Sequence, residues 1–349
     1  MLRQESKQIT LLCSHHYVGN EEALTKKIVT GNRLKTVFQR QKSPSWDKEY
    51  QAGIFATREE APPDSRPSIL TPELLGRDFH CLSEPEKYFS IFGFYSQKFA
   101  GAQEQRMMPA HPIPHPLSTM SSVTDKRMPY LPGTLAIAER IGATHILNTG
   151  SLPAENAGNE VLQIILPFFS DILWAVRETD GTVKKCLNWN IKDEEASFSR
   201  PFQQKQHRNT KTEDVENTIA RHTLERLYHL EADIKTVQLG LDQLDERLQE
   251  NLKVLFGHHR RKVDLDDQLQ VELKERFVTA LQTETPPLEV ILGVMRRHQF
   301  SIDGARTLLW QLIWRRELRV DLFSTLLIDR PLKPEIVDPV MKYADWFRG

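Results

Sequence analysis

The sequence predicts an α/β (α+β) fold that ends in a small domain of winged-helix outline. Two observations predict this class. Strand-like runs at residues 163–176 and 182–191 flank Asp180-Gly181, a strong hairpin signal, and apolar residues recur at helical spacing beyond residue 212. With 349 residues the chain has room for two cores. We divide it into an extension at 1–75, a strand-containing domain at 76–262 and a C-terminal domain at 263–349.

Composition places the chain among ordinary soluble proteins, with 39% apolar and 27% charged residues and a formal net charge of −1. A protein that binds DNA unaided usually carries a basic excess, so contact with DNA would need help from partners. Cys13, Cys81 and Cys186 lie far apart and indicate neither a zinc site nor a disulfide framework. No signal peptide or membrane span is predicted, and a reducing cytoplasm is the expected compartment.

The first part of the chain predicts one well-defined helix start. Residues 1–80 mix short apolar segments with turn formers and predict an irregular extension. A short strand is expected at 79–82, after which Ser83 can cap a helix that has Pro85 and Glu86 in its first turn. Residues 100–132 carry six prolines and predict an extended loop, and residues 133–141 predict a short helix.

The two runs around the hairpin place a carboxylate and an amine on paired strands. Asp171 interrupts an apolar stretch, with Phe168-Phe169 before it and Ile172-Leu173-Trp174 after it. A carboxylate among apolar neighbours needs a partner or a metal ion. Because the hairpin pairs the two strands, we expect Asp171 and Lys192 to lie on neighbouring strands.

Helices dominate the second half of the chain. Residues 203–211 predict a basic loop, in contact with solvent or with a phosphate backbone. Helical patterns follow at 212–233 and 237–256, and the basic run at 258–262 predicts a solvated hinge. Helices at 265–281, 288–298 and 303–316 and a strand at 317–323 complete the winged-helix outline. Trp310 and Trp314, four residues apart, are expected to be exposed anchors for a protein partner.

One set of residues has the groups that phosphodiester hydrolysis needs. The reaction requires a metal ion that polarises the phosphate and supplies hydroxide, and a cation for what the metal does not reach. Magnesium prefers hard oxygen ligands. Asp171 on one strand, Asn190-Ile191-Lys192 at the end of the next and Glu86 at a helix start supply such a set.

Motifs around these residues resemble the TnsA family of restriction-like transposon nucleases. The most specific match is Pro129-Tyr130-Leu131-Pro132 followed by a short helix. The other matching segments are Gly76-Arg77, His80-x-Leu82-Ser83-x-x-Glu86, Phe169-Ser170-Asp171-Ile172-Leu173, Asn190-Ile191-Lys192 and Thr223-Leu224-Glu225-Arg226-x-Tyr228. The likeness extends loosely over nearly the whole chain. Asn190 stands where the family has glutamine, and the segments before Pro129 and after Lys192 are longer than the family pattern.

The resemblance implies a restriction-endonuclease-like mixed sheet flanked by helices, with the nuclease at 76–262 and a partner-binding domain at 263–349. It implies that Glu86, Asp171 and Asn190 bind Mg²⁺, or Mn²⁺ in its place, that Lys192 lies beside the nucleophilic water and that Glu225 belongs to the same acidic cluster. The implied activity is cleavage of transposon-end DNA at the 5′ ends. The implied partners are a TnsB-like DDE transposase, which cuts the 3′ ends, and a TnsC-like AAA+ regulatory ATPase.

Two other interpretations stay open at this stage. Asn190 favours a catalytically inactive adaptor of the same fold, which would link the transposase to the ATPase. A winged-helix transcriptional regulator would need a basic recognition helix. The helix at 303–316 carries Arg306, Arg315 and Arg316 next to its two tryptophans, and the tryptophans favour contact with protein.

Overall fold

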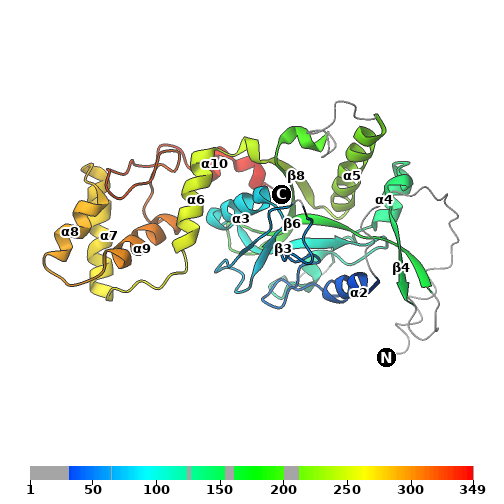
Figure 1. Ribbon diagram of the computed structural model, residues 1–349, viewed down its shortest axis with the longest axis horizontal. Helices are drawn as coiled ribbons and strands as arrows, with labels where there is room; N and C mark the ends of the chain where they lie inside the picture. The colour runs from blue at the N-terminus through cyan, green and yellow to red at the C-terminus, as the bar shows by residue number, and fades with distance from the viewer. Residues whose placement is uncertain (1–30, 64, 124–126, 154–160, 200–211, 349) are drawn as a thin grey trace.

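A four-stranded mixed sheet forms the centre of the protein (Figure 1). The structure, a computed structural model, describes residues 31–63, 65–123, 127–153, 161–199 and 212–348. The strand order is β3-β6-β7-β8, and the strands are β3 (Phe99–Met108), β6 (Phe168–Arg177), β7 (Val183–Lys192) and β8 (Lys235–Gly240). β3, β6 and β7 pair antiparallel, whereas β8 runs parallel to β7. The expected α+β class with a mixed sheet is confirmed.

Helices cover both faces of this sheet because its strands alternate between two apolar cores. On one face α3 (Glu84–Ser96) packs near Trp174 and Trp189. On the other face Leu173 belongs to a core that includes Tyr228 of α5 (Thr212–Leu230) and part of α4 (Thr134–Arg140). Both α4 and α5 agree with the helices expected from the sequence. No helix in the described residues is long and apolar enough to cross a membrane.

The predicted hairpin is present, but the first of its two strands is shorter than expected. Gly181 has a φ of 81°, and Glu178 N–H donates to the Thr182 carbonyl at 2.8 Å. The run at 163–176 is divided at residues 166–167, so its first part belongs to a separate pair, β4 (Thr149–Pro153) with β5 (Val161–Ile165). Pro167 has no N–H to donate to a ladder, which explains the break.

Residues 100–132 are not one extended loop, because β3 occupies the beginning of this segment. The six prolines start only at Pro109, directly after the strand, so they never forbade it. The loop prediction holds for most of the described residues that remain, which contain a short turn, η1 (Pro116–Thr119), and an isolated bridge between Ile113 and Leu131. Leu131, from the most specific family-like motif, is buried there.

The described part of the N-terminal extension packs against the sheet, and it is irregular over residues 41–63 and 65–67, as expected, but not at its two ends. It contains α2 (Gly31–Arg40) and β1 (Ser68–Leu70), which pairs with β2 (Phe79–Cys81). The Tyr50 hydroxyl donates to the Glu104 carbonyl of β3 at 2.6 Å, and Trp46 Nε1 donates to the Pro116 carbonyl at 2.9 Å. These contacts link residues far apart in sequence, which local turn signals do not reveal.

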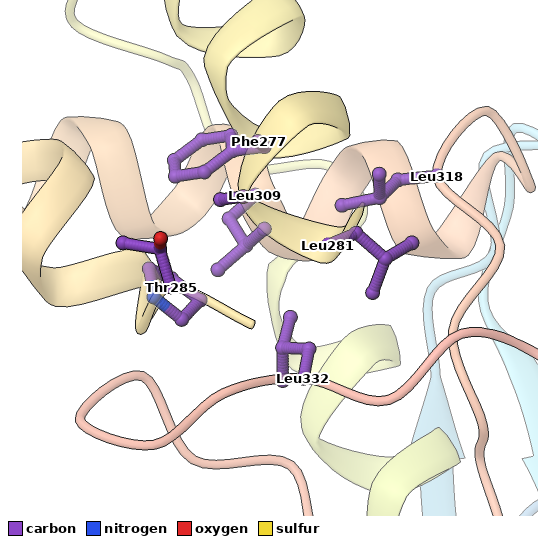
Figure 2. Close-up of a pocket in the computed structure, with 8 residues that line it drawn as sticks. Phe277, Leu281, Thr285, Leu309, Leu318 and Leu332 are labelled. Carbon is purple, nitrogen blue, oxygen red and sulfur yellow. The ribbon is translucent and has the colours of Figure 1, made fainter. Parts of the chain in front are cut away.

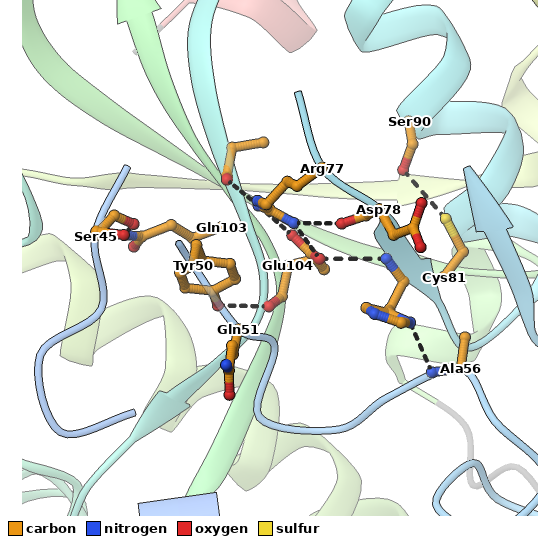
Figure 3. A network of polar contacts seen from close by, with 12 residues as sticks. Ser45, Tyr50, Gln51, Ala56, Arg77, Asp78, Cys81, Ser90, Gln103 and Glu104 are labelled. Atoms are coloured by element: carbon orange, nitrogen blue, oxygen red, sulfur yellow. Dashed lines mark hydrogen bonds and ion pairs between the residues drawn. The ribbon is translucent and has the colours of Figure 1, made fainter. Parts of the chain in front are cut away.

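A buried ion pair joins β3 to the segment that precedes α3 (Figure 3). Arg77 donates to both carboxylate oxygens of Glu104, at 2.7 and 2.8 Å, and to the Ala102 carbonyl at 2.8 Å. Burial raises the pKa of Glu104, and the guanidinium opposes that effect. Because His80 N–H also donates to this carboxylate, the network fixes β2 and the start of α3 against the sheet.

The run at 237–256 is not a helix or helix pair, because its first residues form β8. Val237 and Leu239 lie two residues apart on one face of that strand, with Gln238 between them on the other face. A short turn, η5 (Leu241–Gln243), leads to α6 (Glu246–His258). Asp245 caps α6 by accepting from Leu248 N–H. The leucines that suggested a helical pattern therefore belong to different elements: Leu239 lies in β8, whereas Leu248, Leu252 and Leu255 lie in α6. His259, in the expected hinge, is buried, and its ring stacks on Phe256, so this part of the run is not solvated.

The C-terminal lobe contains the three expected helices, α7 (Asp267–Gln282), α8 (Pro287–Met295) and α9 (Ile302–Trp314) (Figure 1). The expected strand at 317–323 is absent: the described residues there form only an isolated bridge between Val320 and Pro334. The winged-helix assignment is therefore unconfirmed. A cavity of about 10 Å³ inside the lobe, lined by Phe277, Leu309 and Leu332 among others (Figure 2), has room for no more than a single water molecule.

Trp310 and Trp314 are not exposed anchors, because both side chains are buried. The Trp314 ring meets Tyr95 of α3 at 5.6 Å between centroids and Phe256 of α6 also at 5.6 Å. Trp314 therefore joins the C-terminal lobe to the sheet domain, and Trp310 belongs to the same apolar cluster. The helical spacing was correct, but it identified a core face instead of a surface.

The last residues return to the sheet domain, where α10 (Pro339–Lys342) and η6 (Ala344–Phe347) lie beside α3 (Figure 1). The Phe347 ring lies 5.2 Å from that of Phe92, and Trp189 Nε1 donates to the Trp346 carbonyl at 2.8 Å. One apolar cluster runs from the sheet into the C-terminal lobe. The domain boundary at residue 262 remains a prediction. The C-terminal tail, residues 339–348, packs into the core of the domain that precedes this boundary.

Loss of the tail's aromatic contact should destabilise the sheet domain. Phe347 is 7% exposed, so we expect Phe347→Ala to lower the free energy of unfolding by about 3–5 kcal/mol. Ile336 is 82% exposed, and Ile336→Ala should change it by no more than about 0.5 kcal/mol. Urea denaturation of both variants measures the difference, and equal effects would show that the tail does not belong to the core.

Candidate active site

Asp171 lies on β6, one of the two inner strands of the sheet, at the centre of a cluster of polar side chains. In the pairing of β6 with β7, Ile172 lies opposite Trp189, and continuing this register by one residue sets Asp171 opposite Asn190. Directly opposed residues of an antiparallel pair point to the same face, here the face that α5 covers. Ile191 N–H donates to Asp171 Oδ2 at 2.6 Å, and Lys192 Nζ lies 3.5 Å from the same oxygen.

On the other side of Asp171 the sheet ladder is interrupted at Gln105. Glu104 pairs with Ile172 and Arg106 with Ser170, so Gln105 is the residue that would face Asp171. Gln105 has a φ of 48°, a left-handed conformation that costs a residue with a side chain about 1–2 kcal/mol. Its carbonyl accepts from Gly53 N–H at 3.0 Å, and its Nε2 donates to Glu86 Oε2 at 3.1 Å.

Glu86 reaches the cluster from the first turn of α3, as the capping signal predicted. Ser83 Oγ caps the helix by accepting from Glu86 N–H, and it donates to Glu86 Oε1 at 2.9 Å. Leu82 N–H donates to the other carboxylate oxygen at 2.9 Å. Burial raises the pKa of Glu86 to about 8, and the charge of Asp171 adds to the effect.

Glu225 approaches from α5 and is held by two asparagines of β7. Asn188 Nδ2 donates to its Oε1 at 2.8 Å, and Asn190 Nδ2 donates to its Oε2 at 2.6 Å. Burial and, to a smaller extent, the charge of Asp171 raise the pKa of Glu225 to about 7, against the opposing effect of the Asn188 hydrogen bond. Glu86 from α3 and Glu225 from α5 thus lie on the two sides of Asp171. The negative charge of Asp171 disfavours the ionised form of each glutamate.

The sequence indicated no role for Gln105 or His222, and Asn188 was the alternative centre of the second-strand register in case Asn190 is not a ligand. His222 lies 3.1 Å from Asn190 Nδ2 through its Nδ1 atom, and its ring packs edge-on against Phe198. Burial, together with the smaller effects of the charges of Lys192 and Arg221, lowers the pKa of His222 to about 3. The neutral ring can accept from the Asn190 amide. Polar residues at alternate positions of β7 were the available signal for Asn188.

Two amide oxygens of β7, those of Asn188 and Asn190, are buried without a hydrogen-bond partner. The amide nitrogen of Asn190 is used by Glu225 and His222. Asp171 accepts its hydrogen bonds through Oδ2. Among the described residues no three His, Cys, Asp or Glu side chains converge as metal ligands. The predicted set has two carboxylates and one amide, which is sufficient for magnesium only when water or phosphate oxygens complete the shell.

The five predicted site residues, Glu86, Asp171, Asn190, Lys192 and Glu225, therefore come together around Asp171. A groove of about 410 Å³ lies elsewhere, in the C-terminal part, lined by Arg247, Arg330 and Lys333 among others, and contains none of the five. The basic loop expected at 203–211 lies outside the described residues. Comparison with protein-family models and with curated proteins found no match to this chain.

The raised pKa values predict a loss of stability as pH increases. The pKa of Glu86 rises from 4.5 to about 8 in the folded state, so the folded protein binds this proton more tightly than the unfolded chain does. The stabilisation is complete below pH 4.5 and is lost as pH rises through about 8. Glu225 acts in the same direction between 4.5 and about 7.

Glu86→Gln removes the titrating group and should flatten this pH dependence in metal-free buffer, as measured by urea unfolding at a series of pH values. Glu84→Gln is the matched control in the same turn, because Glu84 pairs with exposed Arg66. The electrostatic description of the site is wrong if Glu86→Gln and the wild type lose stability equally with pH.

Proposed function

We propose that the chain is the metal-dependent endonuclease subunit of a heteromeric cut-and-paste transposase, as its TnsA-like motifs imply. The reaction proposed is hydrolysis of a phosphodiester bond at the 5′ ends of the transposon. One observation carries the proposal: Asp171, Asn190 and Lys192 meet at the ends of paired strands, and Glu86 and Glu225 approach from opposite sides.

Glu86, Asp171 and Asn190 would hold the metal ion, through carboxylate oxygens and the unpartnered Oδ1 of the amide. When bound, Mg²⁺ supplies polarisation of the scissile phosphate and a hydroxide at neutral pH. The protein supplies orientation. Ser83 and Leu82 N–H fix the Glu86 carboxylate, and Ile191 N–H fixes that of Asp171, so neither has to reorganise when DNA arrives.

Lys192 is placed to act on the water or the phosphate. Its ammonium donates to the Ile191 carbonyl at 2.9 Å and lies 3.5 Å from Asp171. An ammonium has three N–H donors, so one remains for an oxygen of the attacking water or of the DNA. Its side chain is 33% exposed, which leaves it accessible from solvent.

The partners and the compartment belong to the same proposal. A DDE transposase cutting the 3′ ends, an AAA+ regulatory ATPase contacting the C-terminal domain and a cytoplasmic location all follow from the family-like motifs. A net charge of −1 supports binding to DNA through such partners. With Trp310 and Trp314 buried, contact with the ATPase would use other residues of that domain.

An inactive adaptor of the same fold is the second candidate, and the contacts of Asn190 are what favours it. Its amide is engaged by Glu225 and His222, an arrangement that is stable without a metal ion. Failure of the wild type to cut DNA with its partner subunits present would select this candidate.

Removal of the central groups should abolish cleavage without unfolding the protein. We expect Asp171→Ala, Lys192→Ala and Glu86→Gln each to reduce nicking at the transposon 5′ end at least about a hundredfold. Glu84→Gln should be mild, because Glu84 points away to Arg66. Strand-specific nicking in the reconstituted transposase is the assay, and equal losses from the two glutamate variants would show that α3 does not serve the site.

The two asparagines give a matched test of the metal ligand. Each donates to Glu225, but only Asn190 lies opposite Asp171. Loss of an outer hydrogen-bond partner typically lowers metal affinity about 10–100-fold. In a calorimetric titration with Mn²⁺, Asn188→Leu should lower the affinity within that range, whereas Asn190→Leu should lower it by more. If both variants bind Mn²⁺ equally well, Asn190 Oδ1 is not a ligand.

A further inference from the structure

Arg221 presents a cation at the edge of the acidic cluster. It lies on α5 and is exposed, and its guanidinium carbon is 5.7 Å from the ring centroid of Phe168, near the start of β6. Within the described part of the chain Arg221 forms no ion pair and donates no hydrogen bond. Contact with a ring face uses none of the N–H donors of a guanidinium. All of its donors therefore remain for a ligand.

The position of Arg221 relates it to the site from two directions. It precedes Glu225 by four residues, so both side chains lie on the same face of α5. Phe168 precedes Asp171 on β6, and His222, next to Arg221, contacts Asn190. The positive charge of Arg221 lowers the pKa values of both His222 and Glu225, in addition to the larger effects of burial. Arg221 therefore acts electrostatically on the cluster without neutralising a particular carboxylate.

Lys192 is a second cation at this edge, but its ammonium already has partners within the protein. Lys192 donates to a backbone carbonyl and lies near Asp171, whereas Arg221 has no anion. The charge of Asp171, and those of Glu86 and Glu225 when they are ionised, would repel a DNA strand that approaches them. A guanidinium has a planar set of donors that matches the oxygens of a phosphate, and it keeps its charge at all relevant pH values.

We propose that Arg221 binds a backbone phosphate of the DNA strand that enters the site, and so offsets the repulsion between that strand and the carboxylates. This inference rests on the proposed function for the identity of the ligand. It assigns Arg221 a role in positioning the strand, next to the reacting phosphate and not at it.

The salt dependence of DNA binding tests this role directly. The reconstituted transposase that contains the full-length protein is titrated with a fluorescently labelled transposon-end duplex at several KCl concentrations, with Ca²⁺ in place of Mg²⁺ to prevent cleavage. Loss of one phosphate contact changes the slope of log K against log salt by about 0.9. Arg221→Ala should show this smaller slope, whereas Arg221→Lys should retain the wild-type slope because it keeps the charge.

Arg226→Ala is the matched control, because Arg226 is exposed on the same helix but makes no contact with the site. It removes the same charge and should leave the slope unchanged. A wild-type slope for Arg221→Ala, an equal change in Arg226→Ala, or no binding of DNA by the wild type would each overturn the inference. Normal binding and slopes with no nicking under Mg²⁺ would instead overturn the proposed function and leave the phosphate contact supported.

Discussion

Pairing of β6 with β7 decides which side chains share the face of the sheet beneath α5. Because side chains alternate along a strand, a slip of one residue would turn Asp171 toward α3 and Ile172 toward α5. Trp174 and Trp189, fully buried on the α3 face, oppose such a slip. Their packing therefore fixes the register that sets Asp171 opposite Asn190. The apolar core on one face positions the polar cluster on the other.

Electrostatics explains why this cluster is held so firmly by hydrogen bonds. Three carboxylates with little access to water repel one another, and each ionised form is costly to bury. N–H, hydroxyl and amide donors offset part of this cost at Glu86 and Glu225, and Lys192 offsets part of it at Asp171. What remains appears as the raised pKa values of the two glutamates. Under the proposed function, a divalent cation held by these side chains would offset that remaining cost.

Local signals in the sequence predicted the parts of the site that form within a few residues. Ser83 caps the helix at Glu86 within four positions, and Asp180-Gly181 closes a hairpin, so both were predictable. Features that depend on distant partners were not. β3 is defined by its pairing with β6, β8 by its parallel pairing with β7, and the role of Trp314 by packing against α3 and α6. The positive φ of Gln105 also arises from its surroundings.

The central claim is that Asp171 and Asn190 form one face of a divalent cation site, and its location can be measured directly. A crystal of the full-length protein soaked with Mn²⁺ gives an anomalous scattering peak at each bound ion. We predict a peak in contact with an Asp171 carboxylate oxygen and with Asn190 Oδ1, and loss of that peak in Asn190→Leu. A peak that leaves Asp171 without contact, or a wild-type site that stays free of Mn²⁺ with the side chains arranged as described, would contradict the account.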